Sequence, residues 1–204
     1  MIWPTRQARA RELSRWELFK KVLHVPGSVV VCGVADGMDV CEFALASAIL
    51  EPTAYLRTVI GFDTFEGFPD DVEGAGVAGQ FAGDYYGTQD EIRRYTVNHP
   101  LLEWHAKHPK VELVKGDFMQ TGEDYVYDHP DLLISLLYLD FNAYGPTDAA
   151  LRLFLPLMAG GGLVVVDELS NPRWPGQNRA VYEHYPQAKW QRFTWEPNIA
   201  WVVV

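Results

Sequence analysis

The chain carries acidic residues at five places where a run of apolar residues ends. They are Asp36, Asp63, Asp117, Asp140 and the pair Asp167-Glu168. In an open α/β sheet, ligands bind in the crevice outside the carboxyl ends of the strands, and these apolar runs predict strands. A single Asp at such a place is usually a helix cap or a turn residue. Five acidic places along one edge instead predict a ligand that carries positive charge.

The apolar pattern predicts the elements that bring these acids together. Short apolar runs, typical of strands buried on both faces, alternate with segments of helical periodicity. We expect strands over 28–33, 57–62, 111–115, 132–139 and 163–166, helical segments over 6–22, 38–50, 88–108, 146–158 and 177–184, and a turn at 159–162. Two late strands, 189–195 and 199–204, are expected to form an antiparallel edge. The alternation predicts a doubly wound α/β fold with a mostly parallel, Rossmann-like sheet.

Residues 1–204 are expected to form a single domain, in which 1–24 holds a lead-in helix that could pack against a second copy in a homodimer. The irregular, glycine-rich segment within 70–100 is expected to close over the site as a lid and to contact the acceptor, because functional loops concentrate in such segments.

Composition and charge exclude several classes of function. A net charge of −10, with 17 Lys and Arg and no basic run, argues against a nucleic-acid partner. No segment approaches the roughly 20 apolar residues that span a bilayer, and the N-terminus lacks the apolar core of a signal peptide. We therefore expect a soluble, cytoplasmic enzyme without a membrane partner, whose Cys32 and Cys41 are reduced thiols.

The turn after the first strand distinguishes two nucleotide cofactors. A dinucleotide site needs Gly-x-Gly-x-x-Gly, whose N–H groups bind pyrophosphate, whereas this turn is Gly33-Val34-Ala35-Asp36-Gly37 and its acid would oppose a phosphate. S-adenosylmethionine (SAM) has no phosphate and brings a sulfonium and an ammonium group, and Asp63 stands where the ribose diol needs an acceptor. The residues expected to bind SAM are Gly33, Val34, Ala35, Asp36, Gly37, Asp63, Thr64, Phe65, Gly116, Asp117, Phe118 and Asp140.

Asp140 and the pair Asp167-Glu168 should end neighbouring strands. Three carboxylates there would make an oxygen-rich site of the kind that Mg²⁺ prefers. Such an ion would acidify a bound hydroxyl and hold it for attack on the SAM methyl group. The alternative is that Asp140 belongs to the SAM pocket and the other two acids cap a turn.

Six blocks of sequence resemble the macrocin O-methyltransferase family, whose members methylate sugar hydroxyls of natural products. The blocks are 25–34, 61–69, 114–118, 137–144, 161–168 and 176–181. Phe-Asp-Thr-Phe-Glu-Gly-Phe-Pro at 62–69 is the most specific. The resemblance implies a SAM-dependent O-methyltransferase for a small hydroxylated acceptor, a sugar of a natural product or polysaccharide. It also implies a ribose contact at Asp63, an adenine-side contact at Asp117, and Mg²⁺ ligands at Asp140, Asp167 and Glu168.

Two positions depart from the family pattern. Val31 replaces a Glu, which removes a contact toward the methionine end of SAM. Asn142 replaces the Asp proposed as general base, and an amide cannot accept a proton near pH 7. Asp140 and Asn142 remain the candidate catalytic residues, with Asn142 positioning a hydroxyl or offering an oxygen to the metal. Deprotonation would then come from the metal or from a His. Alternatively, the acceptor is an amine, or the chain is a degenerate relative.

Overall fold

The structure is a computed structural model that describes residues 5–67 and 109–204. The predicted helical segment 88–108 and the predicted lid and acceptor segment 70–100 both lie outside these residues. Within the described part, no helix is long and apolar enough to cross a membrane.

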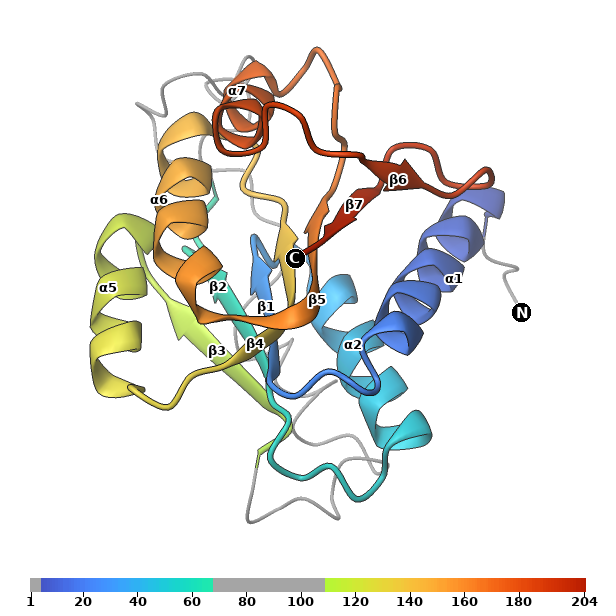
Figure 1. Cartoon of the computed structure of the whole chain (residues 1–204), viewed down its shortest axis with the longest axis vertical. Coiled ribbons are helices and arrows are strands. Elements are labelled where there is room, and N and C mark those ends of the chain that lie inside the picture. The colour runs from blue at the N-terminus through green and yellow to red at the C-terminus, as the bar shows by residue number, and fades with distance from the viewer. Residues whose placement is uncertain (1–4, 68–108) are drawn as a thin grey trace.

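Seven strands form one mixed sheet in the order β3-β2-β1-β4-β5-β7-β6 (Figure 1). Their bounds are β1 Ser28–Cys32, β2 Val59–Asp63, β3 Val111–Lys115, β4 Ile134–Leu139, β5 Met158–Val166, β6 Gln191–Arg192 and β7 Ala200–Val203. The first five strands pair in parallel, whereas β7 pairs antiparallel with both β5 and β6. The predicted fold class and the antiparallel edge are both confirmed.

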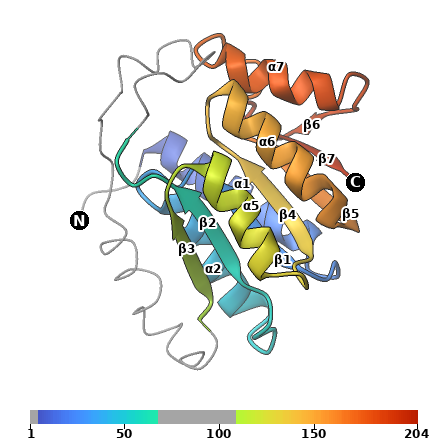
Figure 2. The ribbon, with the colours of Figure 1, turned by 90° about the vertical axis from the view of Figure 1, so that its left-hand side faces the viewer.

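Helices cover both faces of the sheet, α1 and α2 on one side and α5 and α6 on the other (Figure 2). Their bounds are α1 Arg6–Lys21, α2 Met38–Leu50, α5 Phe118–Asp128, α6 Tyr144–Phe154 and α7 Pro175–His184, with a short 3₁₀ turn at Leu155–Leu157. Alternate strand residues serve the two cores: Val29 and Val31 face one, Val30 and Cys32 the other. This explains why β1 reads as a continuous apolar run.

The lead-in helix is part of this core. Leu18 and Phe19 of α1 are fully buried within the chain, and α1 packs along α2. Leu18 and Phe19 therefore pack inside the protomer, whereas Leu13 of the same helix is exposed and the predicted homodimer stays a prediction.

Two local predictions were wrong. Residues 159–162 are not a turn, because β5 starts at Met158 and runs through the three glycines. Gly162 lies so close to the backbone oxygens of Ala159 and Ser135, at 2.8 and 2.9 Å from a built Cβ, that a side chain would not fit. The sequence also gave no sign of α5, since its buried side is narrow and consists of Phe118, Gly122 and Tyr125.

Candidate active site

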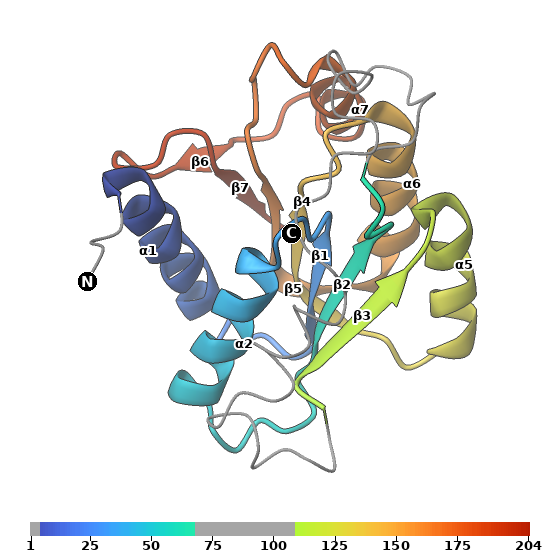
Figure 3. The ribbon, with the colours of Figure 1, turned by 180° about the vertical axis from the view of Figure 1, so that it is seen from behind.

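The carboxyl ends of β1 and β4 meet at the point where the strand order reverses. The chain passes outward from β1 to β2 and β3, then returns to place β4 on the other side of β1. Such a switch point is where open α/β sheets bind their ligands. In Figure 3 the parallel strands point towards the end of the molecule that carries α7. The predicted site residues follow these strand ends.

Asp63 holds the turn after β1. Its Oδ2 accepts from the backbone N–H groups of Val34 and Ala35, at 2.7 and 3.0 Å, and its Oδ1 accepts from the N–H of Phe65 at 2.8 Å. Ala35 has a positive φ of 47°, which a non-glycine residue adopts only when its surroundings impose it. Both carboxylate oxygens therefore shape the predicted cofactor loop.

Gly33 brings this loop against the end of β4. Its φ is 95°, and a Cβ built on it would lie 2.3 Å from the backbone oxygen of Asp140. The N–H of Asp140 in turn donates to the oxygen of Cys32 at 2.7 Å. The cofactor loop and the first acid of the predicted catalytic pair are thus in direct backbone contact.

Two of the predicted cofactor acids have local structural partners. Asp36 accepts from Met38 N at 3.1 Å in the first turn of α2, and Asp117 caps α5 by accepting from Met119 N at 2.9 Å. Both residues are exposed at the edge. One carboxylate oxygen of each residue is therefore used in an ordinary local hydrogen bond at the start of a helix.

The remaining predicted cofactor residues line the same edge with different exposure. Val34, Phe65 and Phe118 are buried, and Phe118 packs edge-on against Phe62 with ring centroids 5.2 Å apart. Thr64 donates to the oxygen of Gly67 at 2.7 Å and so shapes the turn after β2. These side chains pack beneath the edge and support the turns that form it.

Asp167 is fully buried at the end of β5. Its Oδ2 accepts from the hydroxyl of Tyr138 at 2.8 Å and from the guanidinium of Arg11. Burial raises the pKa of Asp167 to about 6, while Arg11 acts in the opposite direction. Among the described residues, no group donates to its Oδ1. Oδ2 of Asp167 therefore has two donors, whereas Oδ1 can still accept a hydrogen bond.

Asp140 and Asn142 lie on the loop after β4. Asp140 as a whole residue is partly accessible, but its carboxyl group is surrounded by protein. This burial raises the pKa of Asp140 well above its ordinary value, and the charge of Asp167 raises it further. Asn142 has a φ of 62°, and its N–H donates to Gln177 Oε1 at 3.0 Å. Its buried Oδ1 has no hydrogen-bond partner in the described part of the chain.

Gln177 ties this loop to β5. Its Nε2 donates to the backbone oxygen of Asp167 at 2.8 Å while its Oε1 binds Asn142, so one buried amide joins the two strand ends. Sequence reasoning did not assign it a role. The only signal was its place in the block 176–181.

Glu168 follows Asp167 in the turn after β5 and adds to the negative charge that acts on Asp140. Its Oε2 accepts from the indole N–H of Trp174, and its φ is 57°. Within residues 5–67 and 109–204, no three His, Cys, Asp or Glu side chains are grouped as a metal site. The three predicted ligands thus act on one another electrostatically, but among the described residues they are not grouped as ligands of one ion.

Two arginines of α1 were also missed. Arg11 reaches Asp167, and Arg15 forms a buried ion pair with Asp39 of α2. Their spacing of four residues places them on one side of the helix. This spacing was the available signal, but the acid that Arg11 meets is 156 residues away.

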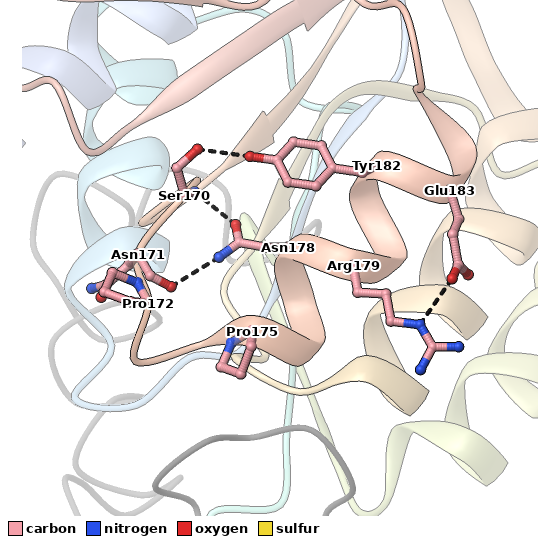
Figure 4. A pocket seen from close by; sticks show the side chains of 8 residues that line it. All are labelled: Ser170, Asn171, Pro172, Pro175, Asn178, Arg179, Tyr182 and Glu183. Atoms are coloured by element: carbon pink, nitrogen blue, oxygen red, sulfur yellow. Dashed lines mark hydrogen bonds and ion pairs between the residues drawn. The ribbon is translucent and has the colours of Figure 1, made fainter.

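A surface pocket of about 620 Å³ lies beside this edge, between the segment after β5 and α7 (Figure 4). In Figure 4, Ser170 and Tyr182 share a hydroxyl–hydroxyl hydrogen bond of 2.7 Å, and Asn178 binds the backbone at Ser170 and Asn171. Arg179 pairs with Glu183 at the rim. Hydroxyl, amide and charged groups thus surround this pocket.

Comparison with known proteins gives a consistent result. The sequence model of the family described as macrocin-O-methyltransferase (TylF) matches residues 7–191. The chain is similar to the crystal structure of CalS11, a calicheamicin methyltransferase, with a TM-score of 0.86 and 29% identity over 98% of this chain and 80% of that one.

Two further solved structures are similar. The apo structure of CalS11, described as a TDP-rhamnose 3'-O-methyltransferase of calicheamicin biosynthesis, has a TM-score of 0.79 and 28% identity over 98% of this chain and 80% of that one. The O-methyltransferase NovP has a TM-score of 0.73 and 23% identity over 95% and 79% of the two chains, which supports the fold alone. A search of curated proteins found no match.

Proposed function

Because the chain belongs to the macrocin O-methyltransferase (TylF) family of SAM-dependent enzymes, we propose that it transfers the SAM methyl group to a sugar hydroxyl of a natural product or polysaccharide. The observation that carries this proposal is the loop Gly33–Gly37, which Asp63 fixes at the switch point between β1 and β4. The loop presents backbone groups and no phosphate cradle, as a sulfonium cofactor requires.

The cofactor occupies the half of the edge formed by the ends of β1, β2 and β3. The residues proposed to contact it are Gly33, Val34, Ala35, Asp36, Gly37, Asp63, Thr64, Phe65, Gly116, Asp117, Phe118 and Asp140. Asp63 acts mainly by holding the turn, since both of its oxygens already accept backbone N–H groups. Any contact with the ribose uses the lone pairs that these bonds leave.

The acceptor hydroxyl is placed in the half formed by the ends of β4 and β5. The buried Oδ1 atoms of Asn142 and Asp167 have no donor among the described residues, and sugar hydroxyl groups next to the reacting one supply such donors. Asp140, on the same loop as Asn142, takes the proton as the hydroxyl oxygen attacks the methyl carbon in line. SAM leaves as S-adenosylhomocysteine, so the products are the methyl ether and the demethylated cofactor.

The sequence-based proposal of Mg²⁺ assistance rests on Asp140, Asp167 and Glu168. This donor set does not fit an ion here, because Glu168 is bound to Trp174 and Asp167 is bound to Arg11 and Tyr138. We therefore derive no step through a metal. The acids of this edge act on the acceptor through hydrogen bonds, and the cation at Asp167 is the Arg11 guanidinium.

Two features support a sugar as the acceptor. A neighbour of 28% identity is described as a TDP-rhamnose 3'-O-methyltransferase. The pocket beside α7 combines a mostly apolar lining with the Ser170 and Tyr182 hydroxyls and the Asn178 amide, which suits the apolar faces and hydroxyl groups of a sugar. The second candidate function, N-methylation or a degenerate relative, is favoured only by Asn142, which stands in place of the family's base.

Asp63 provides the test of the cofactor site. In Asp63→Asn, whichever way the amide turns, its NH₂ group faces a backbone N–H of Val34, Ala35 or Phe65. We expect SAM affinity, measured by calorimetry, to fall by about tenfold or more, since unpaired buried polar groups cost about 1–3 kcal/mol each.

Asp131→Ala, at an exposed acid away from this edge, is the matched control and should bind SAM as the wild type does. If Asp63→Asn binds SAM with unchanged affinity, the loop is not the cofactor site and the proposed function loses its main support.

A further inference from the structure

Arg11 lies at Asp167, where the sequence predicts a bound Mg²⁺ ion. It belongs to α1, far from β5 in the sequence, yet its guanidinium binds Asp167 Oδ2 beside the Tyr138 hydroxyl. The Arg11 side chain keeps 28% of its exposure, whereas Asp167 has none. A solvent-accessible cation is thus inserted against a buried carboxylate at the candidate active site.

The charges around Asp167 show what Arg11 balances. Asp39, Asp140 and Asp167 influence one another electrostatically, and α1 supplies Arg11 and Arg15 to the group. Arg15 is committed to Asp39 in a buried ion pair. Burial alone would lower the pKa of Arg11, but Asp167 raises it above its ordinary value. Arg11 therefore remains charged near neutral pH.

A divalent ion would have to share Asp167 with this guanidinium. Oδ2 already has two donors, so the ion would bind Oδ1 of the same carboxylate. It would then lie close to the positive charge of the Arg11 guanidinium. Like charges repel strongly where the surroundings are poorly hydrated, as they are at a fully buried residue. One oxygen of Glu168, the third predicted ligand, is already bound to Trp174.

We propose that the Arg11 guanidinium is the resident cation of this site, in the place at Asp167 where a divalent ion was expected, and that methyl transfer by this chain needs no metal. Arg11 acts as a positioning residue: it holds Oδ2 of Asp167 together with the Tyr138 hydroxyl and leaves Oδ1 to accept a hydrogen bond from the acceptor. This inference rests on the proposed function for its catalytic consequence but not for its prediction about metal binding.

The first test measures metal binding directly. Mn²⁺ is titrated into the wild-type protein and bound ion is followed by electron paramagnetic resonance, with and without SAM. We expect no stoichiometric Mn²⁺ site, and methyl transfer unchanged after treatment with EDTA. One Mn²⁺ per chain that disappears in Asp167→Asn, or activity abolished by EDTA and restored by Mg²⁺, would overturn the proposal.

Variants on α1 test the positioning role. Arg11→Met should lower kcat by about tenfold or more with little change in SAM affinity, because a charged hydrogen bond to Asp167 is lost. Arg11→Lys keeps the charge and should recover most of kcat. Arg9→Met is the matched control, since Arg9 lies on the same helix and pairs only with the exposed Glu12. Equal kcat in Arg11→Met and wild type would contradict the role.

The two tests separate the possible failures. If Arg11→Met does not fold, Arg11→Lys and the wild-type Mn²⁺ titration still decide the proposal. Absence of SAM binding by calorimetry would refute the proposed function, while the Mn²⁺ result would stand on its own.

Discussion

Replacing Gly33 by alanine is expected to lower the free energy of unfolding by roughly 3–5 kcal/mol and to abolish measurable SAM binding. The new Cβ would lie 2.3 Å from the oxygen and 2.8 Å from the carbon of the Asp140 carbonyl group, which are backbone atoms that cannot rotate away. The φ of 95° is also strained for any residue with a side chain. The loop or the end of β4 must move, and both belong to the candidate site.

The measurement is urea denaturation together with calorimetry of SAM binding. Gly160→Ala is the matched control, because a Cβ at Gly160 meets nothing within 4 Å. We expect its stability to stay within about 1 kcal/mol of the wild type. A Gly33→Ala protein with normal stability and normal SAM affinity would show that the contact between the loop and Asp140 is not required.

Arg15→Met is expected to destabilise the fold by about 3–5 kcal/mol, because it leaves the carboxylate of Asp39 buried without its partner. Only 5% of the Arg15 side chain and 9% of the Asp39 side chain are exposed. The pair joins α1 to the start of α2, directly after the cofactor loop. The free energy of unfolding, again from urea denaturation, is the quantity to compare.

Two further variants sharpen this result. The double variant Arg15→Met with Asp39→Leu should recover most of the loss, since an apolar pair can replace a buried ion pair. Arg9→Met removes an exposed pair with Glu12 and should cost less than about 1 kcal/mol. If Arg15→Met is as stable as Arg9→Met, the buried pair does not hold α1 in place.

The sheet could be predicted from the sequence because its central strands, β1 and β4, are almost entirely buried and therefore continuously apolar. β1 and β3 begin and end within one residue of the predicted ranges. The helix α5 could not, since few of its residues face the core. The glycines at 160–162 signal a turn by composition, yet they lie within β5, where the lack of a side chain at Gly162 lets the strand pass close to neighbouring backbone.

The acids of the site could be located but not assigned. Asp36 and Asp117 each accept a backbone N–H at a helix start, and a local cap has the same sequence signature as a ligand contact. Asp167 was placed correctly at the end of β5, but its partner Arg11 comes from the other end of the chain. Sequence spacing carries no information about such a contact.

Transfer of a labelled methyl group is the most direct test of the account. The protein is incubated with SAM labelled with ¹³C in its methyl group and with a panel of nucleotide-linked sugars that includes TDP-rhamnose, and the products are observed by NMR. The account predicts a new signal from a methyl group bonded to a sugar oxygen, and this signal should also appear in the presence of EDTA. With Asp63→Asn the same signal should be much weaker. Label on nitrogen, or no transfer to any hydroxylated sugar by a protein that binds SAM, would contradict it.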